Sequence, residues 1–209
     1  MSRYESSRFV KDPKIMNREV LKQACDKLGW KYKETTTEFV VTELNRGEHL
    51  HGEYALLLRD GQVTYNSYYL TNGGELVKEL QEVFFPLNVE YARNSVISSF
   101  QANGFTYKKN YRFRPTSEEA DMFFMVGVTQ LPGEEEQRYE IGFTILKDGT
   151  VITDSNYLPD DVNELAHKSM DKLQELFGRD RVMTKKPEYD AFIREHGLTS
   201  SVQKHNIKK

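Results

Sequence analysis

The chain has 209 residues, of which 38% are hydrophobic and 29% charged, and its formal net charge at pH 7 is −3. This balance excludes a largely disordered protein, and the length allows one large globular domain or two small ones. Cys25 is the single cysteine, so no intramolecular disulfide can form. No apolar run is long enough to cross a bilayer and the N-terminus lacks the apolar core of a secretory signal, so we expect a cytoplasmic protein.

The charges are unevenly distributed along the chain. Residues 1–114 carry a net charge of +3, residues 115–178 carry −10, and residues 179–209 carry +4. Blocks of opposite sign can attract each other within one fold or between two chains. The acidic total argues against a protein that coats DNA, whereas a local basic face could still bind a nucleic acid.

Residues 1–114 are expected to form a first α+β unit. Asn17 is a suitable N-cap and Gly29 a C-terminal stop for the helix between them. Pro86 is expected to kink or break the helical segment that begins at Gly74. In chain order, the expected elements are strand 7–11, helix 17–29, strands 30–36 and 38–44, a hairpin of 53–59 and 62–70, helices 74–84 and 87–102, and strand 105–114.

Residues 115–196 are expected to form a second, related α+β unit. Met122–Gln130 is a continuous apolar run, which predicts a strand that is buried on both faces. Asp161 and Glu164 are expected to cap the last main helix, which ends before Gly178. The other expected elements are a hairpin of 139–146 and 150–156 and a short helix at 187–196, and residues 197–209 form a basic tail that we expect to be disordered.

Residues 58–70 and 146–158 are two copies of one motif, with seven of thirteen positions identical at a fixed offset of 88. Each copy places Asp-Gly between two strand-like runs, which predicts a hairpin, because Gly61 and Gly149 can adopt a positive φ without a Cβ clash. We therefore predict an α+β fold of antiparallel sheets with helices packed on one face. The fold would contain an internal duplication of a strand–turn–strand–helix unit, with Gly61 and Gly149 in equivalent turns.

Two stretches resemble uncharacterised protein families. Residues 7–114, with the segments LKQACDKLGW, YALLLRDGQVTYN and NGFTYKK, resemble a small open-reading-frame family of cyanobacteria and algal chloroplasts. Residues 139–189, with a DGTV hairpin, an LxxLxELFG-like helix and a KPEY-like end, resemble a second family of very short bacterial proteins. Genes of both families tend to lie beside AAA+ ATPase genes, so the resemblance implies an accessory role to such an ATPase.

The second resemblance has one departure. Members of the short family carry a cysteine at the start of the helix, whereas this chain has Pro159–Asn163 there and no cysteine. A redox or metal role of that position is therefore not implied for this chain. Neither family supplies an activity to transfer.

Phe105–Arg114 is the segment most suggestive of a binding surface. Strand alternation would place its aromatic residues on one face and Lys108, Arg112 and Arg114 on the other. Such a basic face could bind nucleic-acid phosphates or a partner protein. In the alternative interpretation the aromatic residues belong to the core, and the cations are solvated or neutralised by the acidic second unit.

Other polar clusters give weaker indications of chemistry. His49 and His51 would share one face of an extended segment and could start a metal site, but the sequence marks no third ligand. The acids from Asp154 to Glu164 do not match a calcium loop and are better explained as helix caps. Cys25 lies on an apolar helical stripe and is expected to be buried. We assign no catalytic residues, metal ligands or cofactor, because P-loop, GxGxxG, GxSxG and HExxH motifs are absent.

The sequence favours a non-catalytic adaptor or assembly protein that binds a protein partner, with an AAA+ ATPase as the partner class that the resemblance implies. Association with copies of itself is a further alternative, because the charge blocks have opposite signs. A nucleic-acid-binding accessory protein that uses strand 105–114 is the second hypothesis.

Overall fold

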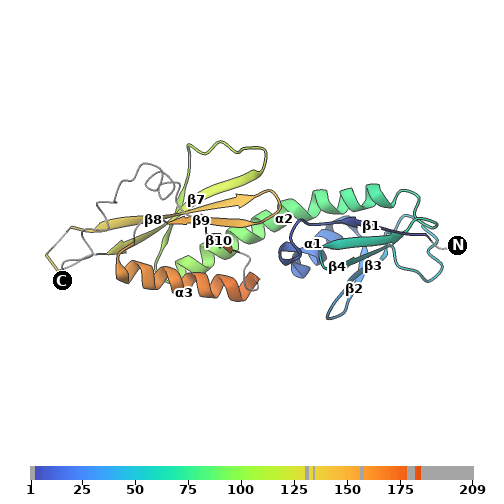
Figure 1. Cartoon of the computed structure of the whole chain (residues 1–209), viewed down its shortest axis with the longest axis horizontal. Helices are drawn as coiled ribbons and strands as arrows, with labels where there is room; N and C mark the ends of the chain where they lie inside the picture. Colours follow the sequence, from blue (N-terminus) through green and yellow to red (C-terminus); the bar gives the residue numbers. More distant parts are fainter. Residues whose placement is uncertain (1–2, 130–131, 134, 156–157, 178–181, 185–209) are drawn as a thin grey trace, which may run out of the picture.

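The computed structural model of this chain describes residues 3–129, 132–133, 135–155, 158–177 and 182–184. Within these residues it contains two five-stranded sheets and three α-helices, which confirms the predicted α+β class. Figure 1 shows two lobes that follow each other along the long axis of the molecule, with helix α2 running from one lobe into the other. The helix expected at 187–196 and the tail expected at 197–209 lie outside the described residues. No helix in the described part is long and apolar enough to cross a membrane.

The N-terminal lobe is an antiparallel sheet packed on one face against α1 and the first half of α2. Its helix α1 (Arg18–Leu28) begins after the predicted N-cap Asn17, whose side-chain oxygen accepts two backbone N–H groups, and ends at Gly29, where φ is +69°. The sheet has the spatial order β1-β5-β4-β3-β2, and its strands are β1 (Tyr4–Arg8), β2 (Lys31–Glu34), β3 (Phe39–Glu43), β4 (Leu56–Arg59) and β5 (Gln62–Asn66). A short 3-10 helix, η1 (Pro13–Ile15), lies between β1 and α1.

The C-terminal lobe is a second sheet that packs against the second half of α2 and against α3 (Asp160–Phe177). Its sheet has the order β10-β9-β8-β7-β6, and the strands are β6 (Thr106–Lys109), β7 (Glu119–Thr129), β8 (Gln137–Leu146), β9 (Val151–Ser155) and β10 (Val182–Thr184). All neighbouring strands are antiparallel except β9 and β10, which are parallel.

Strand β7 is not buried on both faces along its length, in contrast to the expectation from its apolar run. Phe123 and Met125 point to the helices and are fully buried. Phe124 lies on the opposite face and is only half-buried, and Val128 on that face is 43% exposed. The antiparallel sheet therefore packs its helices on one side, as such sheets commonly do.

Helix α2 (Gly73–Gln101) is one continuous helix that belongs to both lobes. Leu80 and Phe84 in its first half are buried in the N-terminal core, whereas Val96 and Phe100 in its second half are buried in the C-terminal core. Pro86 was expected to kink or break this segment, but the helix continues through it. Pro86 removes one backbone hydrogen bond, and packing against a core on each side of it supports the helical conformation.

The division between the two cores falls within α2 and not at the expected boundary after Arg114. Phe100 and Phe105 were assigned to the first unit of residues 1–114, but both pack in the core of the second sheet. Strand β6 likewise pairs with β7 of the second sheet. The reason is that α2 is long enough to reach across both sheets, so the strand that follows it starts in the second lobe.

Both Asp-Gly copies form a hairpin that leads into a helix, but the two turns are not equivalent. In the first copy both Asp60 and Gly61 have positive φ, 49° and 75°, and Arg59 pairs with Gln62. In the second copy only the glycine, Gly149, has positive φ, at 90°, and the loop contains one more residue.

The extra loop residue changes which side chain reaches the core. Val63 pairs with Leu58, which is fully buried, whereas its counterpart Val151 pairs with Ile145. Leu146, the sequence counterpart of Leu58, is only partly buried. A shift of one residue in register exchanges the two faces of a strand. The internal duplication therefore stays a prediction, because identical residues in the two copies have different surroundings.

Replacing Gly149 with Ala should destabilise the protein more than replacing Gly104 with Ala. Both glycines have φ near +90°, so each alanine costs about 1–2 kcal/mol in left-handed strain. Only at Gly149 would the added Cβ lie 2.4 Å from Nδ2 and 2.7 Å from Cγ of Asn88, whereas Gly104 has open space. We expect urea unfolding, followed by circular dichroism, to give an additional loss of about 1–3 kcal/mol for Gly149→Ala. Equal losses in the two variants would contradict this contact.

Cys25 should resist alkylation in the native protein. Its side chain is fully buried on the inner face of α1, and this desolvation, together with the nearby Asp26 carboxylate, raises the pKa of the thiol to about 12. Because the thiolate is the reactive form, iodoacetamide at pH 8 should label the protein only after unfolding. Mass spectrometry measures the label, and a short cysteine peptide serves as the reactive control. Rapid labelling of the folded protein would show that α1 opens readily.

Candidate functional site

The predicted basic strand is shorter than expected. Strand β6 ends at Lys109, and residues 110–114 form a turn and a loop. The reason lies in Asn110, whose side-chain oxygen accepts the backbone N–H of Arg112 at 3.1 Å and whose carbonyl accepts the N–H of Phe113 at 3.3 Å. This local turn replaces the strand conformation. The alternation that would have placed three cations on one sheet face therefore does not extend to Arg112 and Arg114.

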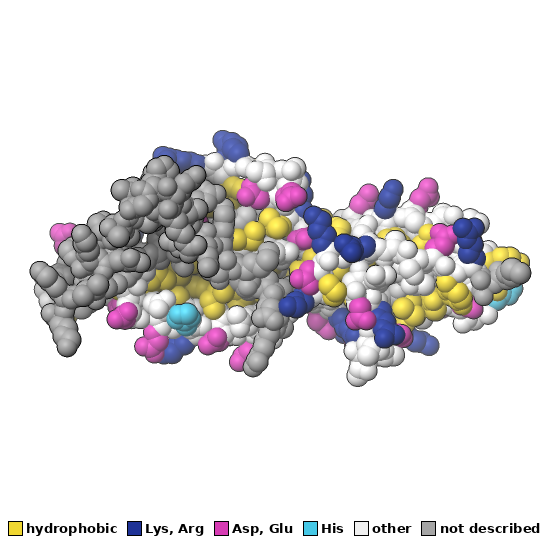
Figure 2. Space-filling model, in the orientation of Figure 1, with side chains coloured by type: hydrophobic (Ala, Val, Ile, Leu, Met, Phe, Trp, Pro, Cys, Tyr) yellow, Lys and Arg dark blue, Asp and Glu magenta, His cyan; other side chains and the backbone are white. Residues whose placement is uncertain are grey.

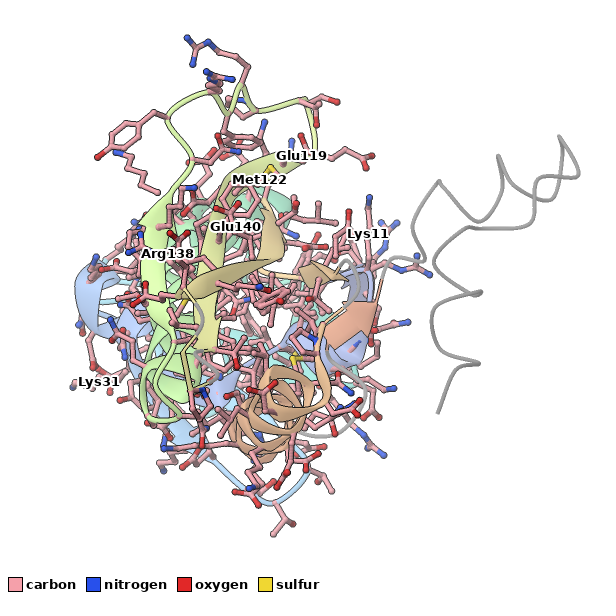
Figure 3. All side chains as sticks on the ribbon, turned by 90° about the vertical axis from the view of Figure 1, so that its left-hand side faces the viewer. Lys11, Lys31, Glu119, Met122, Arg138 and Glu140 are labelled. Atoms are coloured by element: carbon pink, nitrogen blue, oxygen red, sulfur yellow. The ribbon has the colours of Figure 1, made fainter. Side chains whose placement is uncertain are left out.

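The three predicted binding residues lie in different surroundings. Lys108 forms an ion pair with Glu140, which lies on β8 together with Arg138, and both β8 residues are labelled in Figure 3. Arg112 and Arg114 are exposed in the loop, where the guanidinium of Arg114 donates to the neighbouring carbonyl of Phe113. Binding of nucleic acid or a partner by these residues stays a prediction.

The predicted polar clusters have local structural roles. His51 lies in a loop with φ of +51°, and its ring contacts Tyr69 at 5.5 Å between ring centroids. Within the described residues no group of three or more His, Cys, Asp or Glu side chains is arranged to hold a metal ion.

The acids at the start of α3 also have local partners. The carboxylate of Asp161 accepts the hydroxyl of Thr129 at 2.6 Å, and this bond, with backbone N–H groups at the helix start, lowers the pKa of Asp161. Glu164 was expected to cap the helix together with Asp161, but it pairs with Lys168 at 2.7 Å along the helix.

A groove that the sequence did not predict lies between the two lobes. One hollow of about 380 Å³ lies between the end of β1 and the turn that joins β8 to β9. A second hollow of about 650 Å³ continues along α2 and shares Gln81, Phe85 and Lys147 with the first. We call the two hollows together the inter-lobe groove. Figure 2 shows Lys and Arg side chains at the narrow part between the lobes, together with hydrophobic and acidic side chains.

The floor of the inter-lobe groove is apolar. Phe85 is half-buried at its centre and packs against the rings of Phe9 at 6.3 Å and Phe84 at 5.6 Å between centroids. Pro86 and Val89 extend this surface along α2. Pro86, which has no backbone N–H to donate, lies on the surface of α2 that lines the groove.

Hydrogen bonds fix the walls of the groove on both sides. Gln81 on α2 donates its side-chain amide to the carbonyl of Phe9 at 2.8 Å, which holds the segment after β1. The backbone N–H of Lys147 donates to the carbonyl of Glu118 at 2.8 Å, which holds the β8–β9 turn. The buried amide of Asn88 joins the lobes, because it donates to the carbonyls of Ile15 at 3.1 Å and Asp148 at 2.7 Å.

The groove carries more cations than carboxylates. Its lining includes the five cations Arg8, Lys11, Lys78, Arg93 and Lys147, and the three acids Glu82, Glu118 and Asp148. Arg93 pairs with Asp121 at 2.6 Å. The other four cations are exposed, and none of them forms an ion pair within the described part of the chain. This local excess of positive charge contrasts with the net charge of −3 of the whole chain.

The groove could not be predicted from the sequence, because its residues come from three separate stretches, near positions 8–11, 78–93 and 117–148. The one signal in the sequence is Pro86, which marks the point where α2 passes between the lobes. Only the packing of two sheets on one helix brings the three stretches together.

Comparisons with protein-family models, with curated proteins and with solved structures found no match for this chain. The interpretation of its function therefore depends on the geometry of its own residues.

Proposed function

We propose that this chain is a non-catalytic adaptor or assembly protein and that a protein partner binds in the inter-lobe groove. The observation that carries the proposal is the combination of an apolar floor around Phe85 with exposed, unpaired cations contributed by both lobes. Apolar centres with charged surroundings are typical of protein-binding surfaces. Grooves between lobes are also common positions for binding sites.

The chemistry of the lining supports binding rather than catalysis. Among the described residues that line the inter-lobe groove there is no histidine or cysteine. The most common general base and the most reactive nucleophile are therefore not among these groups. The groove instead offers a hydrophobic contact surface and flexible lysine side chains, which suit recognition of another chain.

The resemblance to families whose genes lie beside AAA+ ATPase genes extends the proposal to a cytoplasmic accessory role with such an ATPase as the partner. A second copy of this chain is another candidate, because residues 115–178 carry a net charge of −10 and the groove is basic. Both alternatives place the same groove at the interface.

A second candidate function is nucleic-acid binding at the loop that follows β6. Tyr111 is 82% exposed, and the ammonium of Lys109 lies 5.5 Å from the centroid of its ring. Arg112 and Arg114 are exposed in the same loop. An exposed aromatic ring beside several cations is a feature of surfaces that bind single-stranded nucleic acids.

Groove variants should lose the protein partner in affinity capture. We compare the wild type with the double variant Lys78→Glu/Lys147→Glu, using native lysate treated with nuclease and quantitative mass spectrometry. Two charge reversals at the groove should reduce the recovered partner about tenfold or more, equivalent to about 1.4 kcal/mol or more.

The matched control for this capture is Lys33→Glu/Lys172→Glu, which makes the same charge change at one exposed lysine of each lobe. Strand β2, which holds Lys33, lies away from the groove, since Lys31 of that strand and Lys11 of the groove point to opposite sides of the molecule in Figure 3. Equal recovery with the wild type and the groove variant would contradict the proposed site.

A titration with nucleic acid distinguishes the two candidate functions, because it measures the affinity of the wild type and of a variant of the loop that follows β6. The variant Lys108→Ser/Arg112→Ser/Arg114→Ser should leave the fold intact, because these side chains are exposed. If the loop binds nucleic acid, the variant loses affinity and the slope of log K against log salt falls by up to about two to three. On the adaptor proposal, wild-type binding is already weak at physiological salt. Submicromolar binding that the variant abolishes would favour the second function.

A further inference from the structure

We infer that the segment bound in the inter-lobe groove is acidic and carries one aromatic or large aliphatic side chain that packs on Phe85. This inference rests on the proposed function and specifies the chemistry of the partner. Three features of the groove support it: the position of its unpaired cations, the half-buried ring at its centre, and the exposed carboxylates among the cations.

The unpaired cations surround the apolar floor from three elements. Arg8 and Lys11 lie at the end of β1 and just after it, Lys78 lies on α2, and Lys147 lies in the β8–β9 turn. None of the four has an acidic partner in the described part of the chain. Carboxylates of a bound segment could pair with them, and such pairs would be strengthened where the segment excludes water.

The floor requires an apolar group from the partner. Phe85 is held on one side by Phe9 and Phe84, so its ring is already fixed in position before a ligand binds. Covering its exposed side with an aromatic or large aliphatic side chain removes apolar surface from water. The lysines around it can pack their aliphatic stems on the same side chain while their charges reach the acids of the segment.

The carboxylates of the lining favour a peptide over a nucleic acid in this groove. Glu82 and Glu118 are exposed among the cations. A continuous phosphate backbone would bring negative charge close to both of them, whereas a peptide can place separate acidic residues opposite the lysines. The lining therefore suits spaced carboxylates around an apolar anchor.

A selection from a library of short random peptides displayed on phage tests this chemistry. The wild-type protein should enrich peptides in which Asp and Glu flank Phe, Trp, Leu or Ile. Enriched peptides are then synthesised and their dissociation constants measured by fluorescence anisotropy. Affinity should fall about tenfold or more in Lys78→Glu/Lys147→Glu and remain unchanged in Lys33→Glu/Lys172→Glu. It should also weaken between about 0.05 M and about 0.5 M salt, because exposed charges are screened.

The apolar anchor is tested separately with Phe85→Ala, whose fold is first checked by circular dichroism. Its affinity for the selected peptides should also fall about tenfold or more, and replacing the anchor of the peptide by Ala should have little further effect. Selection of basic or uncharged peptides, or equal affinity of the acidic peptides for the wild type and the Lys78→Glu/Lys147→Glu variant, would overturn the inference.

The test also distinguishes this inference from the proposed function. If affinity capture recovers a partner in a groove-dependent way but acidic peptides are not selected, the adaptor role stands and the inferred chemistry is wrong. If light scattering shows that the wild type dimerises without peptide and that the groove variant is a monomer, a second copy occupies the groove and the inference is overturned.

Discussion

The placement of the two lobes depends on one buried side chain, Asn88. Its amide lies in the middle of α2 and donates hydrogen bonds to the carbonyl of Ile15 in one lobe and that of Asp148 in the other. A buried amide without partners would cost free energy, and these two bonds satisfy the Asn88 amide at the place where the lobes meet. Gly149 makes this approach possible, because any side chain there would overlap the amide. The Asp-Gly turn is therefore required for contact between the lobes as well as for reversal of the chain.

The inter-lobe groove follows from the same geometry. With Asn88 fixing the turn against α2, the neighbouring Lys147 lies across from the segment after β1, and Phe85 lies between them. Hydrogen bonds thus hold the backbone segments that border the groove in place. The cationic side chains of the groove extend from these fixed segments. A site of this kind needs little rearrangement to bind a ligand, which reduces the entropy lost on binding.

Local signals in the sequence predicted the local structure well. The cap Asn17, the stop at Gly29 and both Asp-Gly hairpins were recognised because each depends on a few neighbouring residues. Features that depend on distant contacts were predicted less well. Pro86 is tolerated inside α2 because two cores pack on either side of it, and Ile145 instead of Leu146 reaches the core because the turn gains one residue. The groove could not be predicted, since no sequence pattern brings residues 8, 85 and 147 together.

The sharing of α2 has a consequence for how the molecule can be divided. Each sheet has an apolar face that half of this helix covers, so a cut within either half would leave the corresponding sheet without part of its cover. The two lobes are separate in shape, but one continuous helix couples their stabilities. Unfolding of one half of α2 leaves the other half with a free end that can fray. We therefore expect the two sheets to unfold as parts of one cooperative unit.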